Sequence, residues 1–296
     1  MRTRAGEGGA SQMTDLRDRL GRAVFRRVAG PDGPANRARI HDTPGPRWFG
    51  PERPIRTVHG DASMFIGGLS ALLLQSLHPL AMAAVSAHSG FRGDPWGRLQ
   101  RTSTFLAVTT YGTASDAEDA VARVRSIHER VRGTTADGLA YHAADPHLLG
   151  WVHATETDSF LRAHERYGAR PLDAAGYDAY VADTARVAEA LGVVDPPRDR
   201  QALVRCLASY RPELRPTPEA WAAARFLLHP PVPLAVRPFY GVLAANAVAL
   251  LPPWARSVLR LPRIPVVEGL AVQPSGLLLT HTIRWAMTSG ARSRTK

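Results

Sequence analysis

A histidine lies at the centre of an apolar helix face in this sequence. Successive helical residues are about 100° apart, so the residues that share a face with His128 can be identified directly. They are Ala117, Val121, Val124 and Val131. A neutral core histidine bonded to a backbone carbonyl is the commoner explanation for such a position. The functional alternative is an imidazole that binds a metal ion in an apolar pocket.

Two arginines flank this histidine on one side of the helix. Arg125 precedes His128 by three residues, and Arg132 follows it by four. Guanidinium groups at these positions suit the propionates of a haem whose iron His128 holds. Solvated surface arginines are the more common outcome of such a pattern, and that alternative stays open.

A second group of donors comes earlier in the chain. Arg98, Arg101 and Thr102 occupy positions i, i+3 and i+4 and therefore share a helix face. Two guanidinium groups and a hydroxyl suit an anion, bound dioxygen or negative charge that develops on oxygen. A basic surface patch is the alternative explanation.

A histidine and a glutamate stand one helical turn apart at His153 and Glu156. Such pairs can bind iron, but a di-iron carboxylate bundle needs two Glu-x-x-His motifs and two further glutamates. The sequence contains no Glu-x-x-His, so we reject the di-iron hypothesis. We interpret His153 as a core histidine or one that supports a bound cofactor.

The elements that must position these residues are predicted to be helices throughout. The segment 62–91 has no charged residue and is long enough for a membrane span. Two features favour a buried core helix followed by a second, short one: the pair Gly67-Gly68 and the helix-breaking His78-Pro79.

Local signals predict two further helices in detail. A capping box of Ser115 and Glu118 begins a helix that ends at Arg132, with Gly133 as its C-terminal glycine. Asp145 and Pro146 begin another that ends near Gly168. We expect an all-α protein, an irregular multi-helix bundle around a pocket; a globin-like core is one arrangement that fits. A single domain would cover residues 13–289, with disordered ends at 1–12 and 290–296.

The composition limits the class of partner and the compartment. The net charge is +11, and 36 of the 37 basic residues are arginine. No zinc-finger spacing or aromatic RNA-binding signature accompanies this charge, so we predict no nucleic-acid partner.

The single cysteine, Cys206, excludes an internal disulfide and a cysteine-based cluster. The first twelve residues lack the apolar core of a secretory signal, which predicts a cytoplasmic protein, with peripheral membrane contact as the alternative.

Four motifs follow one another in order: from Gln75 to Met82, over Arg98-x-x-Arg101-Thr102, over Val124-Arg125-x-x-His128-x-x-Val131-Arg132-Gly133, and from Tyr141 to Ala154. Together they resemble the family of rubber oxygenases and MpaB-like oxygenases. Each motif alone is weak, whereas their order and spacing together are fairly specific.

This resemblance implies an all-α fold that holds haem b and carries out dioxygen chemistry in an apolar pocket. Rubber oxygenases cleave the C=C bonds of polyisoprene, and the MpaB branch cleaves an isoprenoid side chain. By analogy His128 is the proximal iron ligand, and Arg98, Arg101 and Thr102 lie on the distal side. The rubber-cleaving enzymes carry lysine where this chain has Arg101. Because arginine stays protonated, the distal position here is expected to be open or filled by water.

The sequence therefore predicts a haem-b oxygenase that cleaves C=C bonds of an isoprenoid- or lipid-like molecule. Its partners would be that apolar substrate, dioxygen and an electron donor. Two alternatives stay open: a haem-binding or sensing protein without turnover, and a membrane-associated helical protein anchored by residues 62–91.

Overall fold

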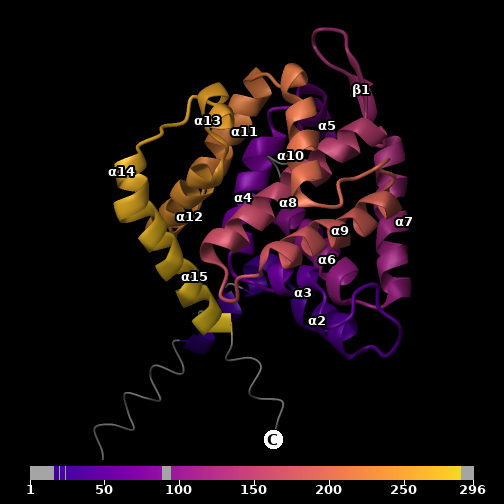
Figure 1. The fold of residues 1–296 in the computed structure, drawn as a ribbon, viewed down its shortest axis with the longest axis vertical. Coiled ribbons are helices and arrows are strands. Elements are labelled where there is room, and N and C mark those ends of the chain that lie inside the picture. Colours follow the sequence, from indigo (N-terminus) through magenta and orange to yellow (C-terminus); the bar gives the residue numbers. More distant parts are fainter. Residues whose placement is uncertain (1–16, 20, 24, 89–94, 288–296) are drawn as a thin grey trace, which may run out of the picture.

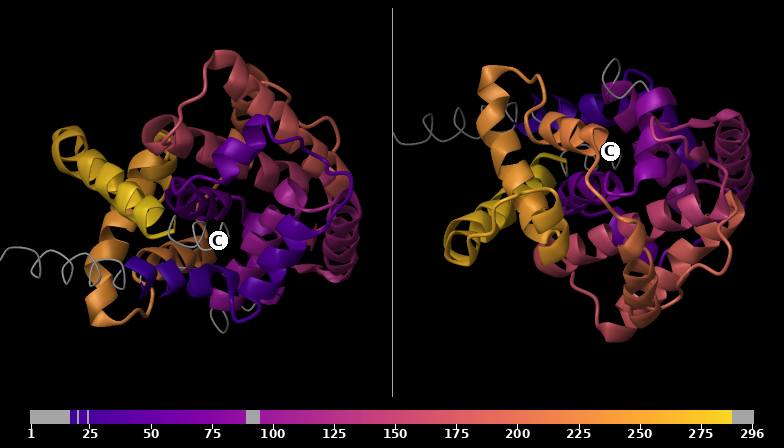
Figure 2. Two further views of the ribbon diagram at one scale, coloured as in Figure 1. Left: turned by 90° about the horizontal axis from the view of Figure 1, so that it is seen from below. Right: turned by 90° about the horizontal axis from the view of Figure 1, so that it is seen from above.

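The computed structural model describes residues 17–287 apart from residues 20, 24 and 89–94. The predicted disordered ends, 1–12 and 290–296, lie outside these residues. Within them the fold is all-α, as predicted, with one small two-stranded hairpin (Figures 1 and 2). Residues 17–29 are helical where they are described. The elements that follow are α2 (Gly33–Asp42), α3 (Pro54–His59), α4 (Met64–Gln75), α5 (Pro79–His88), α6 (Pro95–Tyr111), α7 (Ala114–Arg130), β1 (Arg132–Thr134), β2 (Ala140–His142), α8 (Pro146–Tyr167), α9 (Ala174–Leu191), α10 (Arg200–Ser209), η1 (Arg211–Glu213), α11 (Pro218–Leu228), η2 (Leu234–Val236), α12 (Arg237–Leu250), α13 (Pro253–Val258), α14 (Pro265–Val267), η3 (Glu268–Val272) and α15 (Gln273–Met287).

The long helix α8 runs through the core. It begins where the sequence predicted, because the Asp145 carboxylate accepts a hydrogen bond from the His147 amide at 2.9 Å and Pro146 occupies the first turn. It ends at Tyr167, directly before Gly168. Helix α4 packs closely on it: a Cβ at Gly67 would lie only 2.9 Å from the ring of Phe160. The two helices form the centre around which the others pack.

The apolar segment 62–91 forms two helices joined by a sharp bend, as predicted over its described part. Helices α4 and α5 meet at 106°, and His78 and Pro79 lie at the break. Proline lacks the amide hydrogen that the helix needs, and its ring obstructs the preceding turn. Among the described residues no single helix has the length and apolarity to cross a membrane. The bent pair α4–α5 meets these criteria only when both helices are taken together.

Helix α7 begins and ends earlier than predicted. Its N-cap is Thr113, whose hydroxyl accepts a hydrogen bond from the Asp116 amide at 3.1 Å, so the capping box at Ser115 was wrong. The chain leaves the helix after Arg130 and enters strand β1, so Gly133 does not cap it. Gly133 instead lies opposite Tyr141 in the hairpin, where a Cβ would come within 2.5 Å of the Tyr141 hydroxyl.

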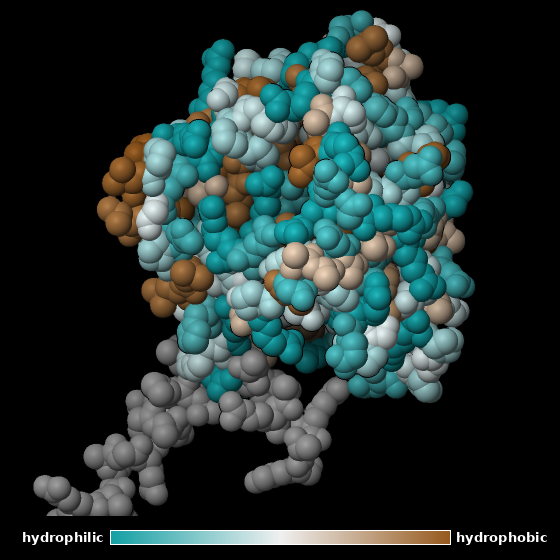
Figure 3. Space-filling view, in the orientation of Figure 1, coloured by the Kyte–Doolittle hydropathy of each residue, from teal (hydrophilic) through white to brown (hydrophobic). Residues whose placement is uncertain are grey.

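The C-terminal helices form one side of the molecule. In Figures 1 and 2 the gold helices α14 and α15 lie on the side opposite α7. Exposed aliphatic side chains gather there, visible as brown atoms at the left edge of Figure 3. They include Ile264, Val266, Val267, Leu270 and Leu278. This apolar edge is therefore well separated from the helix that carries His128.

Candidate functional site

His128 lies in the last full turn of α7, beside the β1–β2 hairpin. Its side chain is half-buried, and Nδ1 is buried without a hydrogen-bond partner among the described residues. Burial lowers the pKa of the imidazole, and the nearby His142 lowers it further. The ring is therefore neutral at pH 7 and has a lone pair to offer. Val121 is buried and Val124 half-buried on the same face, as the sequence predicted.

Helices α6 and α7 form a helical hairpin with only Gly112 and Thr113 between them. The two helices pack on each other. Arg98 stands thirteen residues before the end of α6, and His128 fourteen residues after the start of α7. Arg98 of the predicted distal motif and His128, the predicted iron ligand, therefore lie at similar distances from the turn between the two helices.

Arg98 is half-buried, whereas Arg101 and Thr102 are exposed. Burial lowers the pKa of Arg98, and the charge of Arg101 lowers it further. The two guanidinium groups are therefore close enough to interact, as the spacing predicted. The ring of His128 makes no hydrogen bond or ion pair with any residue that the structure describes. The distal role of Arg98, Arg101 and Thr102 stays a prediction.

The two arginines that flank His128 lie on the protein surface. Arg125 donates to the carbonyl oxygen of Ala190 on α9 at 3.2 Å. Arg132 donates to the carbonyl oxygen of Glu129 at 2.6 Å. Both side chains are exposed, so both can exchange these carbonyl partners for another acceptor. Their predicted contact with haem propionates stays a prediction.

Four helices bring together a group of polar side chains that no local motif marks. We call His59, Thr110, Glu156 and Tyr180 the interior polar cluster; they come from α3, α6, α8 and α9. Nδ1 of His59 lies 2.9 Å from the hydroxyl of Thr110, and Nε2 lies 3.4 Å from that of Tyr180. Burial lowers the pKa of His59 to about 3, so this ring is neutral.

Glu156 is the acid of the interior polar cluster. Burial raises its pKa to about 7, and none of the residues that the structure describes hydrogen-bonds its carboxyl group. The side chain nevertheless keeps some accessible surface. Apolar surroundings disfavour the charged form of a carboxyl group, so the neutral form persists to a higher pH. Glu156 can therefore hold or release a proton near neutral pH in apolar surroundings.

His153 lies one turn from Glu156 on α8. Burial lowers the pKa of its ring to about 4. In the part of the chain that the structure describes, Nε2 is buried without a partner, and Nδ1 has only the Thr157 hydroxyl at 3.5 Å. His153 is thus a neutral core histidine with an unused nitrogen, and its role towards a cofactor stays a prediction.

Sequence reasoning missed most of the interior polar cluster. It considered Glu156 only as a di-iron ligand and did not single out His59 or Tyr180. The available signal was weak: Glu156 shares the predicted helix 145–168 with His153 and the buried Trp151, but Asp158 and Glu165 lie on the same helix. His59 and Tyr180 stand 121 residues apart, and no local pattern joins them.

The chain is similar to two curated proteins whose function is not assigned. These are uncharacterized proteins of Mycobacterium bovis and Mycobacterium tuberculosis. Each is 39% identical over 111 residues, which cover 36% of this chain and 43% of the relative. The match thus spans less than half the length of these relatives. No solved structure matches the chain.

The family comparison covers almost the whole of the described helical domain. Residues 56–285 match the model of the catalytic domain described as "ER-bound oxygenase mpaB/B′/Rubber oxygenase". The matched range contains every residue that the sequence analysis proposed for the site. The described part of this range has the all-α fold that the resemblance implied. The chain therefore belongs to the family of MpaB and rubber-oxygenase catalytic domains.

Proposed function

We propose that this chain is a haem-b-dependent oxygenase that cleaves C=C bonds of an apolar, isoprenoid- or lipid-like substrate. The observation that carries the proposal is the state of His128. Its ring is neutral and half-buried on an apolar helix face, and it has no hydrogen bond within the described part of the chain. Membership in an oxygenase family supports the reaction class.

The residues around His128 fit a haem. A neutral imidazole on an apolar surface is the usual proximal ligand of haem iron. Nε2 of His128 makes no hydrogen bond to a described residue, so it is available for a metal ion. Arg125 on α7 and Arg132 on β1 are both exposed, one on each side of His128 in the chain, and are free to contact propionates at the surface. When bound, haem supplies the binding and activation of dioxygen.

The protein's own residues provide charge, proton and exclusion of water. Arg98 and Arg101 place positive charge on the neighbouring helix of the hairpin, which stabilises negative charge on a reacting oxygen. Glu156 holds a proton near pH 7 and can exchange it within the interior. Val121 and Val124, on the face of α7 that carries His128, would exclude water from an apolar substrate.

The proposed cleavage is balanced without an external reductant. A C=C bond and dioxygen give two carbonyl groups, and both oxygen atoms enter the products. An electron donor is then required only to reduce the iron before the first turnover.

Haem content of histidine variants tests the iron ligand. The full chain, expressed with haem supplied, should purify with a Soret band. His128→Ala should lose most of its haem while its helical circular dichroism stays close to that of the wild type. His142→Ala is the matched control, because this neighbouring histidine is already paired with Glu129 at 3.5 Å. Full haem content in His128→Ala would refute the ligand assignment. If only the His153→Ala variant lost its haem, His153 would be the iron ligand instead.

Oxygen consumption distinguishes an enzyme from a haem carrier. The haem-loaded chain is mixed with alkenes of increasing length, from isoprenoid alcohols to unsaturated fatty acids. We expect oxygen uptake together with carbonyl products from the matching substrate class. Haem binding without oxygen uptake on any of these alkenes would favour the non-catalytic alternative.

A further inference from the structure

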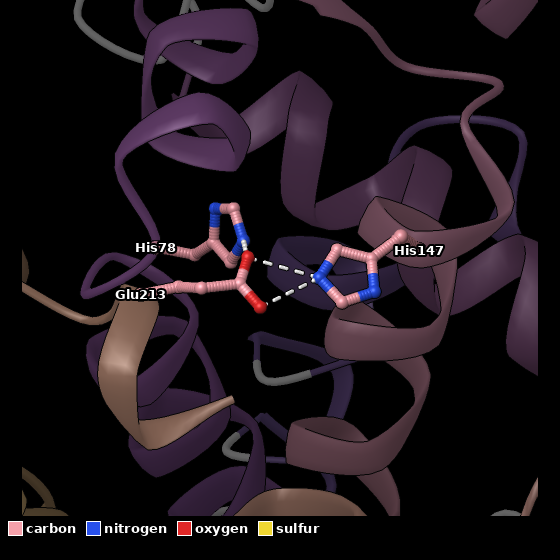
Figure 4. A group of neighbouring side chains, drawn as sticks. All are labelled: His78, His147 and Glu213. Carbon is pink, nitrogen blue, oxygen red and sulfur yellow. Dashed lines mark hydrogen bonds and ion pairs between the residues drawn. The ribbon is translucent and has the colours of Figure 1, made fainter. Parts of the chain in front are cut away.

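Three side chains converge on one point at the break between α4 and α5, away from the residues discussed above. His78 lies at the break, His147 in the first turn of α8, and Glu213 at the end of η1 (Figure 4). One ligand atom from each lies within 4.8 Å of the other two. No sequence motif joins these residues, which come from three separate segments.

The distances suit a shared cation. Nε2 of His147 lies 2.9 Å from each carboxylate oxygen of Glu213, and Nε2 of His78 lies 3.3 Å from one of them. In a tetrahedral zinc site with bonds of about 2.0–2.1 Å, neighbouring ligand atoms lie roughly 3.3 Å apart. The three side chains thus need little movement to enclose a metal ion.

The burial of His78 suits a ligand. Its side chain is only 2% exposed. Nδ1 is buried without a partner within the described structure. Nε2 is the ring nitrogen that faces the carboxylate of Glu213, so it is the atom that a shared cation would meet.

Contacts other than the ligands already hold the three segments together. The amide of Arg215 donates to the carbonyl oxygen of Leu77 at 3.1 Å, which joins the segment after η1 to the α4–α5 break. The indole of Trp151 donates to the carbonyl oxygen of Gln75 at 3.1 Å. The hydroxyl of Tyr210 donates to the carbonyl oxygen of His147 at 2.8 Å. The ligand positions are therefore fixed by the fold before any metal binds.

One coordination position faces solvent. The side chains of His147 and Glu213 are 51% and 43% exposed, and His147 lines a shallow surface hollow with Val193, Cys206 and Tyr210. Two imidazoles and one carboxylate leave room for a water molecule as fourth ligand. Imidazole ligands favour zinc and similar first-row metals over magnesium or calcium.

We propose that His78, His147 and Glu213 form a site for a divalent first-row cation, with Zn²⁺ as the fitting occupant. The bound ion connects the α4–α5 break, the start of α8 and the segment after α10. It fixes the bend from which α5 leads into α6, the helix that carries Arg98. The site is separate from His128 and does not depend on haem.

Zinc binding by the purified full chain tests the site. The protein is treated with a chelator, dialysed against zinc, and analysed for zinc and for haem iron; affinity is measured by calorimetry. We expect one zinc ion per chain and a melting temperature that rises with free zinc. His147→Ala and Glu213→Gln are exposed changes that leave the fold intact. Each should weaken zinc binding by at least the roughly 10–100-fold that loss of a supporting contact costs.

The chain provides a matched control in the pair His142 and Glu129, an exposed histidine–glutamate contact of 3.5 Å that belongs to no three-ligand group within the described residues. His142→Ala and Glu129→Gln should bind zinc like the wild type. Haem content should be unchanged in Glu213→Gln, so failure of this site and failure of the haem proposal give different results. Absence of saturable zinc binding in the wild type would overturn the inference. Equal affinity in wild type, His147→Ala and Glu213→Gln would do the same.

Discussion

Burial raises the pKa of the Tyr180 hydroxyl well above its usual value, and the carboxyl group of Glu156 lies close enough for its negative charge to raise that pKa further. The two residues come from α8 and α9 and belong to the interior polar cluster. The hydroxyl of Tyr180 also meets Nε2 of His59 at 3.4 Å. A proton on Glu156 therefore determines whether the interior polar cluster is neutral or carries a negative charge.

This relationship predicts how stability depends on pH. The pKa of Glu156 rises from 4.5 in the unfolded chain to about 7 in the fold. The native state therefore binds the extra proton between these values, and stability falls as pH rises through that window. One pKa unit corresponds to about 1.36 kcal/mol. Ionisation of Glu156 therefore lowers the free energy of unfolding by up to about 3 kcal/mol above pH 7.

Glu156→Gln removes this dependence because the amide does not titrate. We expect the variant to be more stable than the wild type at pH 8, with the difference in unfolding midpoint shrinking towards pH 5. The exposed Glu118 on α7 provides the control Glu118→Gln, which should follow the wild-type profile. Parallel pH profiles for wild type and Glu156→Gln would show that this carboxyl is not desolvated.

The distal motif can be tested with one conservative substitution. Lysine at position 101 can lose its proton and ligate iron, which arginine cannot. If residue 101 faces the iron, the haem-loaded Arg101→Lys variant should shift towards a six-coordinate low-spin absorption spectrum as pH rises. Arg123→Lys, an exposed change on α7, is the control and should leave the spectrum as in the wild type. A pH-independent spectrum in Arg101→Lys would remove residue 101 from the distal side.

Gly133→Ala tests the hairpin that follows the His128 helix. The new methyl group would lie within 2.5 Å of the Tyr141 hydroxyl and 2.8 Å of its ring, so the ring must move. Overpacking of this kind typically costs about 1–3 kcal/mol. We expect a lower melting temperature and weaker haem retention, because Val131 leads directly from the helix of His128 into β1. The double variant Gly133→Ala/Tyr141→Ala should recover part of the effect of the first change if the ring contact causes it. Gly138→Ala is not a matched control, because Gly138 has φ +86° and an alanine with this backbone angle would be strained without any contact to Tyr141.

Local signals were sufficient for the helices whose ends depend on neighbouring residues. Asp145 and Pro146 begin α8 because capping and the missing proline amide act within one turn. His78-Pro79 ends α4 for the same kind of reason. These effects need no tertiary partner, and the all-α class follows from them and from the periodicity of apolar residues.

The start of α7 needed a tertiary contact. Both Thr113-x-x-Asp116 and Ser115-x-x-Glu118 match a capping pattern, so local sequence does not choose between them. In the fold the Ala114 amide donates to the carbonyl oxygen of Pro46 at 2.8 Å, which fixes the turn before the helix. A contact between residues 68 positions apart has no local signature.

The sequence by itself determined the helical class, the family motifs and the placing of His128 on an apolar face, because periodicity and motif spacing are properties of neighbouring residues. Only the tertiary structure brought Glu156 beside Tyr180, and His78 beside His147 and Glu213. Each of those groups joins residues from separate elements, and burial between the helices raises the pKa values of Glu156 and Tyr180. Burial depends on how the helices pack, and packing is a property of the whole chain.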